Sequence, residues 1–93
     1  MASSRNELPP WLFHNFFSLG IGVATARFIH AHEVAMLVAT QVIWVLSMVF
    51  ISARAKSNGG KFLGSEVYFY HGVSIPFYVA GLLFAACAYA VFG

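Results

Sequence analysis

Hydrophobic residues run along this chain in three long stretches, which short polar and charged segments separate. The stretches cover residues 11–28, 34–53 and 67–92. As helices rising 1.5 Å per residue they would be about 27, 30 and 39 Å long, close to or above the thickness of a bilayer's hydrocarbon layer. The second stretch contains no Lys, Arg, Asp, Glu or His, and the third contains none after His71. The pattern predicts an all-α integral membrane protein with three transmembrane helices, forming a single membrane domain over residues 1–93.

Residues that favour helix ends mark most of the predicted boundaries. A polar N-terminal segment, residues 1–10, ends in two prolines, which suit the first turn of a helix because its N–H groups have no intrahelical partner. The sequence Ser-Asn-Gly-Gly at 57–60 is a strong helix stop, and it lies in a predicted basic loop over residues 54–66. Pro76 cannot donate a hydrogen bond to the carbonyl of Gly72, so we expect a kink in the third helix.

The connection between the first two stretches is less certain, because the run from Arg27 to Glu33 contains neither Gly nor Pro. The alternative architecture is an N-terminal helix lying in the interface, followed by a two-helix transmembrane hairpin. Positive charges help to choose between the two. Three spanning helices would place four basic residues on one side and only Arg27 on the other, which the positive-inside rule favours. The four are Arg5, Arg54, Lys56 and Lys61.

Composition and charge exclude several functional classes. The chain is 60% hydrophobic and 9% charged, with a mean hydropathy of +0.79, whereas about a quarter of a soluble domain is charged. The net charge of +2 is too small to indicate a nucleic-acid partner. We expect an organellar inner or photosynthetic membrane, or a bacterial inner membrane. The N-terminus and loop 54–66 should face the cytoplasm, matrix or stroma.

Histidines are the first candidates for chemistry. His14 and His71 should lie at similar depth near the basic side, where two helices could present axial imidazoles to a haem or a chlorophyll-type pigment. The simpler interpretation is that both are packing residues near the interface. His30 and His32 could ligate zinc or copper only in a turn, because residues two apart do not share a helical face. We favour a polar interhelical turn there and expect no cofactor to be bound by this chain alone.

Small residues spaced four apart form the most coherent pattern, since this spacing lets membrane helices approach closely. Each hydrophobic stretch carries such a set. Gln41 is a polar residue near the middle of the second stretch, and its amide should hydrogen-bond another helix. The predicted packing residues are Ser18, Gly22, Ala26, Ala35, Ala39, Gln41, Gly81 and Ala85.

The run Ala26–His32 (ARFIHAH), with Pro10–His14 (PWLFH) before it, resembles the third helix of the MAPEG family of membrane glutathione and eicosanoid enzymes. The resemblance implies a glutathione-dependent enzyme in which Arg27 is the residue of interest. The chain departs from the family in its spacing from His14 to Arg27. It also lacks the four-helix length and the amino-terminal Arg/Asn/Glu glutathione motif.

The sequence therefore favours a small, non-catalytic accessory subunit of a multi-subunit membrane complex, with respiratory or photosynthetic electron transport as the expected setting. No Gly-rich phosphate loop, paired carboxylates or nucleophile elbow appears. We expect the partners to be other integral membrane subunits and membrane lipids. Arg54, Lys56 and Lys61 should contact lipid head groups or an acidic partner surface. The alternatives are a haem- or pigment-binding electron-transfer subunit and a MAPEG-like enzyme.

Overall fold

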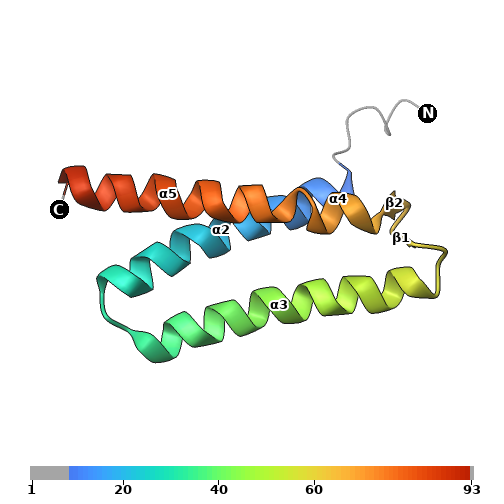
Figure 1. The fold of residues 1–93 in the computed structure, drawn as a ribbon, viewed down its shortest axis with the longest axis horizontal. Helices are drawn as coiled ribbons and strands as arrows, with labels where there is room; N and C mark the ends of the chain where they lie inside the picture. Colours follow the sequence, from blue (N-terminus) through green and yellow to red (C-terminus); the bar gives the residue numbers. More distant parts are fainter. Residues whose placement is uncertain (1–8, 93) are drawn as a thin grey trace.

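The computed structural model describes residues 9–92, which fold into a bundle of three long helices with one short hairpin (Figure 1). In chain order the elements are α2 (Pro10–His30), α3 (Val34–Lys56), β1 (Lys61–Phe62), β2 (Ser65–Glu66), α4 (Val67–His71) and α5 (Ser74–Phe92). Three helical spans, with α4 and α5 counted as one, are long and apolar enough to cross a bilayer. Arg5 and most of the predicted polar N-terminal segment lie outside the described residues.

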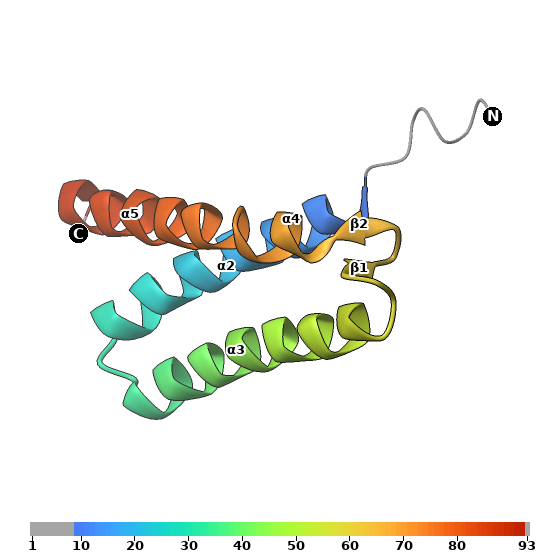
Figure 2. The same ribbon diagram turned by 45° about the vertical axis from the view of Figure 1, so that its right-hand side comes forward.

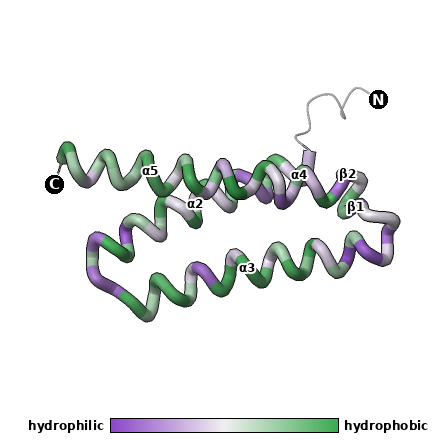
Figure 3. Tube along the Cα trace, in the orientation of Figure 1, coloured by the Kyte–Doolittle hydropathy of each residue, from purple (hydrophilic) through white to green (hydrophobic). Residues whose placement is uncertain are grey.

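Polar residues gather at the two ends of the bundle (Figure 3). One end carries the turn between α2 and α3, and the other carries the end of α3 and the hairpin. α3 ends at Lys56 rather than at Ala53, so Arg54 and Lys56 belong to its last turn, where cations suit the helix dipole. α2 likewise extends to His30 and has Arg27 and His30 in its last turn.

The turn between α2 and α3 reverses the chain without Gly or Pro because His32 takes the left-handed conformation, with φ of 59°. Two backbone hydrogen bonds close the turn: His32 N–H donates to the Ile29 carbonyl, and Glu33 N–H donates to the Phe28 carbonyl. This pair of bonds is a Schellman motif, in which the left-handed residue is usually Gly. Histidine is one of the few other residue types enriched in this conformation, which explains how the turn forms.

Replacing His32 with Gly should stabilise the protein by about 1 kcal/mol, because glycine adopts a positive φ without the steric cost that a side chain brings. Ala31 is the matched control. Its φ of −85° is ordinary, so Ala31→Gly should lower the free energy of unfolding by roughly 0.5–1 kcal/mol through the added entropy of the unfolded chain. Thermal unfolding in detergent, followed by circular dichroism, measures both changes. Equal effects of the two substitutions would contradict the described turn.

The hairpin lies within the predicted loop and is an addition to what the sequence indicated. Lys61 pairs with Glu66 and Phe62 with Ser65, and Leu63 and Gly64 at the tip have φ of 52° and 85°. Positive φ at both central residues is typical of a type I′ turn, which normally carries Asn-Gly or Asp-Gly. Leu63 in place of Asn or Asp removed the usual signal for a hairpin from the sequence.

Tyr70 joins the hairpin to the helices. Its side chain is 1% exposed, its hydroxyl donates to the Phe62 carbonyl at 2.8 Å, and its ring packs edge-on against the Phe62 ring. The third span is interrupted at Gly72 and Val73, which separate α4 from α5. Pro76 consequently falls in the first turn of α5, where its missing N–H costs little.

α2 and α5 form the closest helix pair, and α2 contacts α3 less extensively. Gly22 faces the α5 backbone so closely that an added Cβ would lie 2.1 Å from the Tyr78 carbonyl oxygen. Gly81 is the reciprocal residue, since its Cβ would lie 2.2 Å from the Leu19 carbonyl oxygen. Figures 1 and 2 show α2 beside α5 near α4 and diverging from it toward the α2–α3 turn. α2 thus runs along the length of the bundle, as a third spanning helix would. The interfacial alternative would instead place it across the end of the bundle.

Candidate functional site: the polar interior of the bundle

A hydrogen-bonded triad, Thr25, Gln41 and Tyr78, joins one side chain from each long helix. The Gln41 amide Nε2 donates to Thr25 Oγ1 at 2.7 Å, and the Tyr78 hydroxyl donates to Gln41 Oε1 at 2.5 Å. Thr25 Oγ1 also lies 3.2 Å from the Tyr78 oxygen and donates to the Ile21 carbonyl at 2.8 Å. Both ends of the Gln41 amide are therefore bonded to other helices.

A second cluster, formed by Ser18, Trp44 and Ser74, again draws one side chain from each helix. The Trp44 indole Nε1–H donates to Ser18 Oγ at 3.0 Å, and Ser74 Oγ lies 2.7 Å from the same oxygen. Ser18 and Ser74 are both fully buried. The Trp44 ring stacks on the Tyr78 ring at 4.2 Å between centroids, which joins this cluster to the triad. We call the six residues of both clusters the interhelical polar network.

Helical periodicity explains why α3 presents this network inward. Thr40, Gln41, Trp44, Ile51 and Ala55 lie on one side of the helix and are buried or half-buried. The predicted packing residues Ala35 and Ala39 lie on the other side and are exposed. They make no close helix contact within the described chain, so any such contact would need a second chain.

The predicted small residues of the other two helices lie at the α2–α5 contact. Ser18, Gly22 and Ala26 are buried on α2, and Gly81 and Ala85 are buried on α5. The sequence indicated Gln41 and Ser18 but did not indicate their partners Thr25, Trp44, Ser74 and Tyr78. The available signal was the occurrence of hydroxyl and indole groups deep inside apolar stretches, where each polar group needs a partner.

His14 in the first turns of α2 and His71 at the end of α4 lie at the same end of the bundle, where these two helices contact each other. His71 Nε2 lies 3.3 Å from Ser52 Oγ. The His14 ring lies 5.6 Å from the Tyr70 ring, and its buried Nε2 has no hydrogen-bond partner among residues 9–92. Asn15 is fully buried beside it, with its Nδ2 donating to the Phe69 carbonyl at 3.2 Å. Buried Tyr70 therefore occupies the space beside His14.

The other two histidines, His30 and His32, do not come together. The His30 ring stacks on Tyr89 of α5 at 4.2 Å between centroids, while His32 is exposed in the turn. Over residues 9–92, no group of three or more His, Cys, Asp or Glu side chains comes together to hold a metal ion. Arg27 is exposed in the last turn of α2. Three further basic residues are exposed at the opposite end of the bundle: Arg54, Lys56 and Lys61.

The interhelical polar network links the three long helices through side-chain hydrogen bonds. Its donors and acceptors bond to one another or to the helix backbone. No protein-family model, curated protein sequence or solved structure matches this chain.

Proposed function

We propose that this protein is a three-helix integral membrane protein that serves as a non-catalytic subunit of a larger membrane complex. The observation that supports this function is the interhelical polar network, in which every member is engaged within the chain. Such a network holds the helices in one arrangement and leaves binding to the outer surface. Nearly all of the described chain would lie in the bilayer, so its partners would be other membrane-spanning helices.

The outer side of α3 is the face we assign to the partner. Ala35, Ala39 and Ala53 lie on this side and are exposed, as are the larger residues Val42 and Leu46 between them. Small residues four apart allow a second helix to approach closely, which is the main way that helices associate in lipid. In this arrangement the basic residues at the end of α3 would contact lipid head groups or acidic side chains of the partner.

Purification of the tagged full-length protein in mild detergent should yield an assembly containing other integral membrane proteins. Ala39→Phe should lower their recovery about fivefold by preventing close helix approach. The matched control is Val45→Phe, because Val45 is also exposed on α3 but lies about 120° around the helix. Native gels and mass spectrometry measure the recovery. A protein that always runs alone, or only with copies of itself, would refute the proposed function.

The same preparation tests the alternative of a haem-binding subunit. The partner-free Nε2 of His14 favours that alternative, whereas the contact of His71 with Ser52 and the position of Tyr70 oppose it. A visible absorption spectrum separates the two functions. A Soret band that disappears in a His71→Ala variant would replace the structural function with electron transfer.

A further inference from the structure

A cavity of about 240 Å³ opens between α2 and α5, where the two helices diverge toward the α2–α3 turn. Its walls are mainly apolar, and none of the residues that line it is Lys, Arg, Asp or Glu. They are Ala26, Ile29, His30, Leu82, Ala86 and Tyr89. Neither cluster of the interhelical polar network contributes to it, so the cavity is separate from the polar interior.

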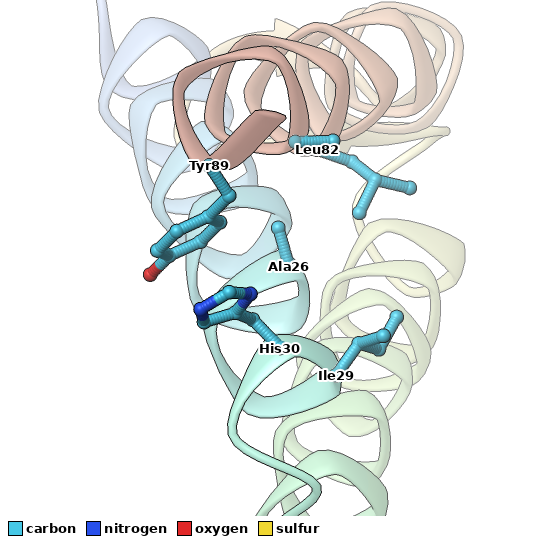
Figure 4. Close-up of a pocket in the computed structure, with 6 residues that line it drawn as sticks. Ala26, Ile29, His30, Leu82 and Tyr89 are labelled. Atoms are coloured by element: carbon cyan, nitrogen blue, oxygen red, sulfur yellow. The ribbon is translucent and has the colours of Figure 1, made fainter. Parts of the chain in front are cut away.

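His30 supplies a polar group to this cavity, and its ring is held in place by stacking on Tyr89, with only 6° between the ring planes. Figure 4 shows one His30 ring nitrogen turned toward Ala26 and Ile29, whereas the Tyr89 hydroxyl points away from them. The His30 side chain is exposed, and it has no hydrogen-bond partner within residues 9–92. A group that fills the cavity can therefore satisfy this nitrogen.

The position and size of the cavity limit what it can hold. It lies beside the last turn of α2, and in a spanning arrangement that turn would lie near the boundary between hydrocarbon and head groups. Its volume is below the roughly 300–1,000 Å³ of sites that enclose drug-sized ligands, so it can hold one ring while the rest of the ligand extends into lipid. A charged head group is disfavoured because the lining offers no opposite charge.

We propose that this cavity binds the six-membered ring of a neutral lipid, with a ring oxygen hydrogen-bonded to His30. Lipid quinones and sterols share this chemistry. A plain acyl chain could fill the same space, but it would offer the His30 nitrogen no hydrogen bond. The inference requires the chain to lie in a bilayer, and it does not require the protein to belong to a complex.

The test uses the full-length protein in phosphatidylcholine nanodiscs, with its histidines labelled with nitrogen-15. The probes are decylubiquinone, cholesterol and, as a linear alcohol, n-decanol. We expect one ring lipid to shift the His30 resonance saturably, and decanol to give no saturable shift. The His30 signal is assigned by its loss in His30→Phe. Decylubiquinone carries a quinone ring and cholesterol a sterol ring, so the probe that binds shows which class of ring lipid the cavity takes.

Variants test the position of the ligand. Ala86→Leu should fill the cavity and weaken binding about tenfold or more, measured as the saturation of lipid adducts by native mass spectrometry. Ala80→Leu, the same change at an exposed residue elsewhere on α5, should leave it unaltered. His30→Phe retains an aromatic ring beside Tyr89 but should weaken binding about fivefold through the lost hydrogen bond.

Circular dichroism and thermal unfolding confirm that each variant retains its helices, so a loss of binding cannot be mistaken for unfolding. Three results would overturn the inference: no saturable binding of either ring lipid, equal binding of decanol, or unchanged binding by Ala86→Leu. Each of these can occur whether or not the protein co-purifies with partners.

Discussion

Gly22→Ala should destabilise the protein by about 3 kcal/mol, although it adds only one methyl group to the chain. Overpacking typically costs about 1–3 kcal/mol, and the upper end applies here because flexible side chains cannot relieve the clash. The new Cβ would meet the Tyr78 carbonyl oxygen at 2.1 Å and the Leu82 backbone nitrogen at 2.8 Å. Only a separation of α2 from α5 would make room for it. Gly81→Ala should have a similar effect, because its Cβ would approach the Leu19 carbonyl oxygen.

Gly20→Ala provides the matched control on the same helix. Beyond the neighbouring backbone of its own helix, a Cβ at Gly20 would have no atom within 4 Å, so the substitution should raise stability by roughly 0.5–1 kcal/mol through the better helix propensity of Ala. Denaturation of the purified protein with sodium dodecyl sulfate, followed by far-ultraviolet circular dichroism, gives both free energies. If Gly22→Ala and Gly20→Ala unfold at the same detergent fraction, the close packing of α2 and α5 is incorrect.

Gln41→Leu should loosen α3 from the other two helices and cost about 1–2 kcal/mol, the range found for interhelical hydrogen bonds in membranes. The amide makes one bond to Thr25 on α2 and one to Tyr78 on α5, and leucine replaces neither. Trp44 reports the change, because its ring stacks on Tyr78 only while α3 is in place. In a Trp11→Phe background, quenching of Trp44 fluorescence by a brominated detergent should increase.

Thr40→Val is the control for Gln41→Leu. Thr40 is buried on the same helix but its hydroxyl donates only to the Met36 carbonyl of its own helix, at 2.6 Å. This variant should leave Trp44 quenching unchanged. A double-mutant cycle of Gln41→Leu with Tyr78→Phe should give a coupling energy of about 0.6 kcal/mol or more. Additive effects of the two substitutions would show that the bond between them contributes nothing to stability.

The sequence was sufficient to predict three helices of spanning length, because charge is absent from long stretches and concentrated between them. It did not establish the turn at residues 31–33. The usual rule requires Gly at the left-handed position, and His32 takes that position at some steric cost. The sequence did not predict the hairpin for a related reason, since Leu63 occupies a position where Asn or Asp is expected.

The packing partners were harder to predict than the helices themselves. Spacing alone gave Gly22 and Gly81 as close-packing residues, but spacing contains no information on which helices pair. Gln41 was predicted to bond another helix, yet its partner Tyr78 could not be chosen without the register of α3 against α5. The exposed side of α3 and the cavity beside His30 depend on how helices diverge in space, which residue spacing does not encode.

The distribution of burial among the helices has a consequence for biogenesis. The α2 span is the least apolar of the three, yet 33% of it is buried, against 11% of each of the other two. During synthesis α2 leaves the ribosome before α3 and well before α5, the helix that it contacts most extensively. Until α5 arrives, Ser18 and Thr25 would face lipid or the translocon without the serine and tyrosine that they meet in the finished bundle. We therefore expect α2 to become stable in a membrane only once α5 has also entered.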